Sequence, residues 1–254
     1  MKLAIVQTHI IWENAVENRS HFAQKINGSL EDVDLIVLPE MFSTGFTMHP
    51  ERVAETMQGD TILWLQHLAQ AKNCAIIGSL IIAEKGKFYN RLLFVYPDGT
   101  LKHYDKRHLF SLAGEDKEFS AGKNRLIVEY KGWNICPLIC YDLRFPVFSR
   151  NNENYDLLIY VANWPNVRAN AWNALLKARA IENMSYTVGV NRIGVDENKN
   201  KYFGDSQIID CMGNYTLEPH QSDSMIIVEL DKKTQDRNRK KFGFLNDKDE
   251  FELT

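Results

Sequence analysis

Short apolar runs recur along the whole chain. They are rich in β-branched and aliphatic residues, which is typical of strands, and they read "KLAIVQ", "DLIVLPE", "CAIIGSLII", "NRLLFVYPDG", "NRLIVEYKGWNICPLIC", "DLLIYVANW" and "YTVGVNR". Cores such as "LIVL" and "LLIYV" have no polar alternation. A strand without alternation is buried on both faces, so the pattern predicts sheets that are covered on both sides.

Apolar positions at helical spacing lie between several of these runs. They predict helices over Asn14 to Leu30, Asp60 to Lys72 and Asn170 to Met184. In the last helix one side is apolar at its start and polar towards its end, formed by Trp172, Leu175, Leu176, Arg179 and Asn183. No linker rich in Ser, Pro or Gly, no repeat and no low-complexity tract interrupts the alternation. We therefore expect a single α/β domain over residues 1–254.

Composition narrows the classes of function. The chain has 254 residues, of which 44% are hydrophobic and 25% charged, as expected of a globular protein. A formal net charge of -3 provides no general field that would attract nucleic acid or an anionic membrane. The charged stretch "DKKTQDRNRKK" mixes both signs and predicts an exposed helix near the C-terminus. We expect neither a nucleic-acid partner nor a membrane partner.

Cysteine usage and the apolar segment lengths bear on the compartment. The four cysteines contain no CxxC pair, which argues against a disulfide framework and against a zinc ribbon. No uninterrupted apolar stretch approaches 18 residues, and the N-terminus lacks the pattern of a signal peptide. The sequence predicts a protein of the reducing cytoplasm.

Chemically capable side chains follow several predicted strands. Glu40 comes after "DLIVLP", Lys106 follows the strand that leaves at Tyr104, and Cys140 ends "NICPLIC". In α/β architectures, ligands collect at the carboxyl ends of strands. Singly, each residue has an ordinary explanation: a surface or capping carboxylate, a solvated lysine, a core cysteine. Together they provide the base and the counter-charge that a thiol nucleophile needs.

Three segments carry a resemblance to a known family. "LPEMF", "YDKRHLF" and "CYDLRFP", in this order, resemble the signature of the carbon-nitrogen hydrolase, or nitrilase, superfamily. Further similar segments extend over nearly the whole chain: "GEDKEFSAG", "VANWP", "KARAIEN", "GVNRIG" and "YFGDS". Within the superfamily, "MFSTGF", "CYDLRFPVFSRN" and "YVANWP" most closely resemble the bacterial omega-amidases.

This resemblance implies a Glu-Lys-Cys triad of Glu40, Lys106 and Cys140. A second glutamate of the superfamily lies seven residues before a glycine, which here gives Glu115, with Glu118 as the nearby alternative. Glu40 would serve as general base, and the oxyanion would be held by Lys106 and by the backbone N–H of Tyr141.

The implied reaction is hydrolysis of the terminal amide of a small 2-oxo acid, such as 2-oxoglutaramate or 2-oxosuccinamate. The products are the 2-oxo dicarboxylate and ammonia, formed through a thioester on Cys140 without a metal or another cofactor. Four alternatives stay open. They are a nitrilase, an amidase for deaminated glutathione, a papain-like couple with His108 as base, and a non-catalytic binding protein.

Substrate contacts are less well defined by the sequence. Arg144 and Arg168 are candidates for the substrate carboxylate, because a carboxylate needs a cationic or N–H-rich partner. Aromatic residues near strand ends are candidates for the walls of the pocket: Phe42, Phe46, Tyr141 and Trp164. His108 is a further candidate contact, and it could instead pack or hydrogen-bond beneath the loop.

The resemblance also implies a four-layer α-β-β-α sandwich that forms a homodimer or a higher homo-oligomer. Helical layers would pair across a two-fold interface. We expect the helix from Asn170 and the C-terminal helix and tail, which span Asp231 to Leu253, to form that interface.

Overall fold

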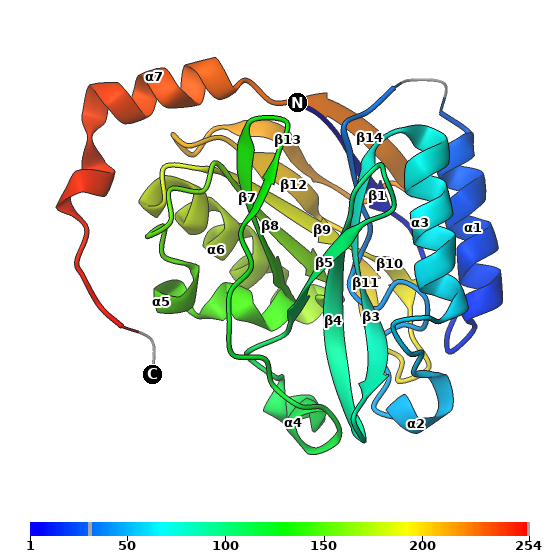
Figure 1. The fold of residues 1–254 in the computed structure, drawn as a ribbon. Helices are drawn as coiled ribbons and strands as arrows, with labels where there is room; N and C mark the ends of the chain where they lie inside the picture. The colour runs from blue at the N-terminus through cyan, green and yellow to red at the C-terminus, as the bar shows by residue number, and fades with distance from the viewer. Residues whose placement is uncertain (30–31, 253–254) are drawn as a thin grey trace.

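Two six-stranded sheets lie face to face in the computed structural model, which describes residues 1–29 and 32–252 (Figure 1). The first sheet has the strand order β14-β1-β2-β3-β4-β5. Its strands are β1 (Lys2–Gln7), β2 (Leu35–Val37), β3 (Ala75–Glu84), β4 (Lys87–Val95), β5 (Leu101–Asp105) and β14 (Ser224–Glu229). Within it, β1, β2 and β3 run parallel, so β2 ends at the same edge as its neighbours.

The second sheet has the order β13-β12-β9-β8-β7-β6. Its strands are β6 (Val128–Tyr130), β7 (Trp133–Ile139), β8 (Leu157–Ala162), β9 (Tyr186–Asn191), β12 (Ser206–Ile209) and β13 (Tyr215–His220). The central strands β7, β8 and β9 are parallel, which brings their carboxyl ends together. A separate hairpin, β10 (Ile193–Val195) with β11 (Lys201–Phe203), follows β9.

Helices cover the outer faces of both sheets (Figure 1). In the first sheet, Leu3 and Ile5 of β1 belong to the core between the sheets, whereas Ala4 and Val6 pack with the helices α1 (Ala15–Asn27) and α3 (Asp60–Lys72). The second sheet is covered by α5 (Pro146–Ser149) and α6 (Ala169–Glu182). Strands buried on both faces are therefore confirmed, and so is the four-layer α-β-β-α arrangement.

The predicted helices correspond closely to observed ones. Helix α3 has the predicted bounds, and α6 begins and ends within two residues of the prediction, with Trp172, Leu176 and Arg179 buried as expected. Helix α1 ends at Asn27, earlier than predicted, and Leu30 lies outside the described residues. The side chain of Asn14 caps this helix by accepting a hydrogen bond from the Glu17 N–H at 3.1 Å.

The C-terminal charged helix exists, but one side of it is not exposed. In α7 (Lys232–Phe242), Gln235 is buried, and its Oε1 accepts a hydrogen bond from the Tyr186 N–H at 2.8 Å. Arg239 donates to Asp156 Oδ1 at 2.9 Å. These bonds attach α7 to the second sheet, so the helix predicted to be exposed is exposed on one side only. The predicted tail ends at Leu253, which lies outside the described residues.

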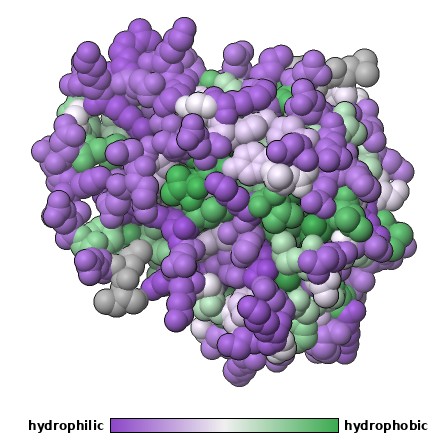
Figure 2. All heavy atoms as spheres, in the orientation of Figure 1, coloured by the Kyte–Doolittle hydropathy of each residue, from purple (hydrophilic) through white to green (hydrophobic). Residues whose placement is uncertain are grey.

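The surface follows this layering. On the face drawn in Figure 2, hydrophilic residues cover most of the molecule, and apolar residues are concentrated near the middle, over the two sheets. Among the described residues, none of the helices combines the length and the apolar character that a membrane crossing requires.

Candidate active site

Four side chains from distant parts of the sequence converge at the edge where β2, β5 and β7 end. Glu40 follows β2, Lys106 comes directly after β5, Cys140 follows β7, and Glu115 begins the short helix α4 (Glu115–Glu118). Glu40, Lys106 and Glu115 are buried, and the exposed fraction of Cys140 is 8%. The sequence prediction named all four, and the structure brings them together.

Lys106 lies between two buried carboxylates. Its Nζ donates to Glu40 Oε1 at 2.9 Å and to Glu115 Oε2 at 2.9 Å. Asn90 of β4 donates through Nδ2 to Glu40 Oε1 at 2.8 Å and to Glu115 Oε1 at 3.2 Å. Glu118, the alternative to Glu115, is exposed. The lysine and the amide therefore fix both carboxylates in one hydrogen-bonded cluster.

One cation shared by two carboxylates determines how the cluster binds protons. Burial disfavours the charged form of Lys106, but Glu115 and Glu40 outweigh it, and the pKa of Lys106 is raised. The pKa of Glu115 is also raised, because burial and the charge of Glu40 exceed the effect of Lys106. The ammonium form of Lys106 is thus strongly favoured.

Cys140 stands on a sharp turn between β7 and the 3-10 turn η2 (Cys140–Arg144). Its φ is +41°, in the left-handed region that non-glycine residues rarely adopt. Asp142 holds this turn, because its Oδ2 accepts hydrogen bonds from the Ile139 N–H at 3.0 Å and from the Tyr104 hydroxyl at 2.8 Å. Its Oδ1 accepts from the His108 N–H at 3.1 Å. Asp142 therefore ties the cysteine turn to the segment that carries Lys106.

For Cys140, the protonated thiol is favoured over the thiolate. Burial first, and then the negative charge of Glu40, raise its pKa well above the usual value, and Lys106 offsets them only in part. The thiol must therefore lose its proton during attack. Glu40 Oε1 is occupied by Lys106 and Asn90, whereas Oε2 accepts from the Asn163 N–H at 2.8 Å and keeps capacity for a second proton donor.

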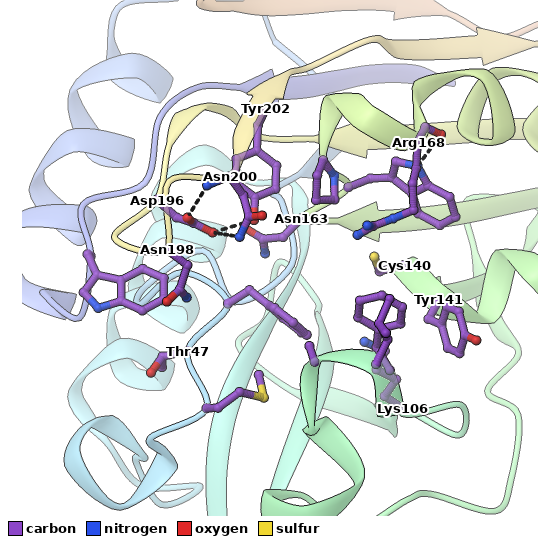
Figure 3. Close-up of a pocket in the computed structure, with 18 of the residues that line it drawn as sticks. Thr47, Lys106, Cys140, Tyr141, Asn163, Arg168, Asp196, Asn198, Asn200 and Tyr202 are labelled. Carbon is purple, nitrogen blue, oxygen red and sulfur yellow. Dashed lines mark hydrogen bonds between the residues drawn. The ribbon is translucent and has the colours of Figure 1, made fainter.

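A cavity of about 440 Å³ opens beside the thiol (Figure 3). The guanidinium of Arg144 lies over the Trp164 ring at 5.0 Å, and that of Arg168 lies over Phe110 at 5.1 Å. Polar side chains of the β10–β11 hairpin also line the cavity: Asp196, Asn198, Asn200 and Tyr202. Asp196 Oδ2 accepts hydrogen bonds from Asn200 at 3.0 Å and from Tyr202 at 2.8 Å. The cavity can hold an anionic group at the arginines and polar groups at the hairpin.

Most predicted contact residues line this cavity: Phe46, Tyr141, Arg144, Trp164 and Arg168. Phe42 does not, and its placement in the pocket wall was wrong. Its ring is fully buried against Phe22 and Trp64, with ring centroids 5.4 Å and 6.0 Å away. It also lies over Gly78 of β3, where an added Cβ would come within 2.9 Å of Phe42 Cδ1. Gly78 was the available signal in the sequence, because a glycine within an apolar strand indicates that another group packs closely against it.

His108 also lies outside the cavity lining. Its ring stacks on Phe145, with centroids 3.7 Å apart, and Nδ1 pairs with Asp142 Oδ1 at 2.8 Å. The structure therefore places it beneath the loop, as the second interpretation predicted, and its placement among the substrate contacts was wrong. Sequence reasoning missed Asn90, although a polar residue within the apolar run "NRLLFV" needs a buried partner.

The shared cation predicts a pH-dependent stability effect. We expect Lys106→Met to lower the free energy of unfolding by about 3–5 kcal/mol near neutral pH, because Glu40 and Glu115 lose their common partner. Without the lysine, the pKa of Glu115 rises further above its unfolded value, so the folded state binds this proton more tightly. The loss of stability should be largest at pH values above the pKa of Glu115 in the folded variant. It should shrink as the pH falls towards the pKa of an unfolded glutamate, about 4.3.

Urea unfolding of wild type and Lys106→Met, from about pH 8 to about pH 5, measures this difference. Lys102→Met is the matched control, because Lys102 is an exposed lysine of β5. A stability difference that does not change with pH would contradict the shared-cation interpretation.

Comparisons with known proteins cover most or all of the chain. A model of the carbon-nitrogen hydrolase family matches residues 2–239. The chain is 44% identical over 255 residues to the omega-amidase YafV of Yersinia enterocolitica, covering 100% of this chain and 98% of the relative. It is 30% identical over 234 residues to the 2-oxoglutaramate amidase of Bacillus subtilis (strain 168), covering 90% of each chain.

A solved structure resembles the whole molecule. XC1258 from Xanthomonas campestris, described as a CN-hydrolase superfamily protein with an arsenic adduct in the active site, superposes with a TM-score of 0.98 at 39% identity. The superposition covers 100% of this chain and 99% of the other. The region of similarity contains the complete cluster of Glu40, Lys106, Glu115 and Cys140.

Proposed function

Because this chain belongs to the carbon-nitrogen hydrolase family, we propose that it is an omega-amidase. It hydrolyses the terminal amide of small 2-oxo acids, such as 2-oxoglutaramate and 2-oxosuccinamate, to the 2-oxo dicarboxylate and ammonia. The observation that supports this most directly is the buried Lys106, held by Glu40 and Glu115, beside a thiol that lines a cavity. The 44% identity to an omega-amidase supports the substrate class.

Acylation begins when Cys140 Sγ attacks the amide carbon. Glu40 Oε2 takes the thiol proton as the bond forms, so no free thiolate is required. The ammonium of Lys106 and the N–H of Tyr141 stabilise the negative charge that develops on the amide oxygen. Collapse of the tetrahedral intermediate breaks the carbon–nitrogen bond, and Glu40 delivers its proton to the departing ammonia.

Deacylation reverses these roles with water as the nucleophile. Glu40 removes a proton from water as it attacks the Cys140 thioester, and the same oxyanion donors act again. The dicarboxylate leaves, and the proton returns from Glu40 to the thiol. Glu115 keeps Lys106 in place throughout, because both of its oxygens accept from Nζ, at 3.0 and 2.9 Å.

Arg144 and Arg168 recognise the carboxylate of the 2-oxo acid. Both line the cavity, each above an aromatic ring, and a guanidinium binds a carboxylate through charge-assisted hydrogen bonds. The same charges disfavour an α-ammonium group, so the 2-oxo acid binds better than the corresponding amino acid. The cavity of about 440 Å³ also admits a leaving group larger than ammonia, which favours deaminated glutathione as the second candidate substrate.

Product release from three compounds tests this function. We expect rapid ammonia release from 2-oxoglutaramate and release slower by about tenfold or more from L-glutamine, because the latter places a cation near the arginines. Cleavage of deaminated glutathione, followed as dicarboxylate formation, decides the second candidate. If the folded wild-type protein hydrolyses none of the three, the omega-amidase proposal fails, and nitriles and other amides become the compounds to test.

A homodimer or higher homo-oligomer in the cytoplasm is also part of this proposal. Apolar side chains are exposed on the segments expected to form the interface: Ile181, Phe242, Phe244 and Phe251. The thiols of Cys74, Cys136, Cys140 and Cys211 are free, which agrees with a reducing compartment. Sedimentation velocity measures the oligomeric state, and a monomer at micromolar concentration would contradict this assembly.

A further inference from the structure

Asn163 contacts the general base and also lines the cavity. It follows the last residue of β8, and its exposed fraction is 5%. Its backbone N–H donates to Glu40 Oε2 at 2.8 Å, and its side-chain Nδ2 donates to the backbone oxygen of Glu40 at 2.6 Å. Figure 3 draws it at the cavity, between Cys140 and the group formed by Asp196, Asn200 and Tyr202. Asn163 is thus attached to Glu40 at two points.

The orientation of the Asn163 amide follows from these contacts. The backbone oxygen of Glu40 is an acceptor only, so the side-chain NH₂ must face it and Oδ1 must point away. Within the described residues, this buried Oδ1 has no hydrogen-bond partner. A buried acceptor without a donor is unfavourable and uncommon in native proteins. Asn163 lines the cavity, so a ligand bound there can supply the missing donor.

We propose that Asn163 Oδ1 accepts a hydrogen bond from the N–H of the scissile amide and thereby makes the site selective for amides. This inference rests on the omega-amidase function proposed above. In the tetrahedral intermediate, the nitrogen must direct its lone pair towards Glu40 Oε2 to receive the proton. An acceptor for one N–H fixes that orientation, and Asn163 and Glu40 are joined directly.

The atoms balance without a further reactant. The proton that Glu40 takes from the Cys140 thiol passes to the nitrogen, the carbon–nitrogen bond breaks, and its electron pair leaves with ammonia. Asn163 Oδ1 keeps its hydrogen bond to one N–H from the bound amide to the departing ammonia. An ester of the same acyl group offers no N–H and gains nothing from Oδ1.

The test compares 2-oxoglutaramate with the terminal methyl ester of 2-oxoglutarate. Asn163→Ala should lower kcat/KM for the amide roughly 10- to 100-fold more than for the ester. Asn90→Ala is the matched control, because Asn90 also donates to Glu40, at Oε1, and is absent from the cavity lining. It should lower both rates and leave their ratio unchanged, because it disturbs the base without touching the substrate. Thermal unfolding checks that both variants are folded.

The outcomes separate this inference from the proposed function. If wild type hydrolyses the amide but Asn163→Ala lowers amide and ester equally, Asn163 only positions Glu40 and the inference is overturned. The same conclusion follows if Asn90→Ala changes the ratio as much as Asn163→Ala does. If folded wild type hydrolyses neither compound, the proposed function fails, and this inference fails with it.

Discussion

Cys140→Ala should abolish ammonia release from 2-oxoglutaramate, with kcat lowered by at least on the order of 10⁴-fold. The substitution removes the sulfur that forms the thioester, and no other cysteine lines the cavity among the described residues. Glu40 and Lys106 remain, so binding and oxyanion stabilisation survive without covalent chemistry. Loss of the nucleophile therefore has the largest effect of any single change at this site. Steady-state ammonia release, with enzyme concentrations high enough to detect residual turnover, measures it.

Cys136→Ala is the matched control for this result. Cys136 lies on β7 four residues before Cys140 and is fully buried in the core, where burial raises its pKa to about 12. We expect this variant to keep wild-type turnover and to lose only a small part of the free energy of unfolding. Retention of more than about one part in a hundred of the activity by Cys140→Ala would mean that water attacks directly. Equal losses in both variants would indicate a structural effect.

The fold was predictable as far as the apolar pattern is local. The central strands and the three long helices produce strong periodic signals, and the burial of β1 on both faces follows from its uninterrupted apolar run. The run from Asn124 to Cys140 was less informative, because it contains two strands, β6 and β7, separated by Lys131 and Gly132. Both residues have positive φ, of 48° and 75°. A two-residue turn within an otherwise apolar stretch leaves little trace in periodicity.

The candidate site was also predictable only in part. Glu40 and Cys140 could be located because each follows an apolar strand, where polar side chains are conspicuous. Lys106 follows the mostly polar strand β5, and the resemblance of "YDKRHLF" to the family signature identified it. The bonds from Asn90 and Asn163 to Glu40 join residues 50 and 123 positions apart, and the sequence does not show such pairings. Phe42 was misplaced for a related reason, since the side on which a strand-end aromatic ring packs depends on the sheet beneath it.

Glu40→Gln should make the thiol more acidic and the enzyme much slower. The negative charge of Glu40 raises the pKa of Cys140, whereas Lys106 lowers it. Glutamine keeps the shape of Glu40 but has no negative charge. The effect of Lys106 is then less strongly offset, so the pKa of the Cys140 thiol falls. Turnover nevertheless should drop by about 10²- to 10⁴-fold, because the amide of glutamine cannot accept the thiol proton or return it to ammonia.

Two measurements together decide this prediction. The ultraviolet absorbance of the thiolate, titrated in Glu40→Gln and corrected with the double variant that also carries Cys140→Ala, gives the thiol pKa. Ammonia release gives kcat for the same protein. Glu118→Gln is the control, because Glu118 is exposed and lies near the cluster in sequence without contacting Lys106. It should change neither quantity.

The direction of the thiol pKa separates two mechanisms that share the same residues. If a preformed thiolate beside Lys106 attacked the amide, a variant with a more acidic thiol would contain more of the reactive species and would keep or gain activity. Attack coupled to proton transfer predicts the opposite, a more acidic thiol with slower turnover. An unchanged or raised thiol pKa in Glu40→Gln, or turnover close to wild type, would contradict the role of Glu40 as the proton acceptor.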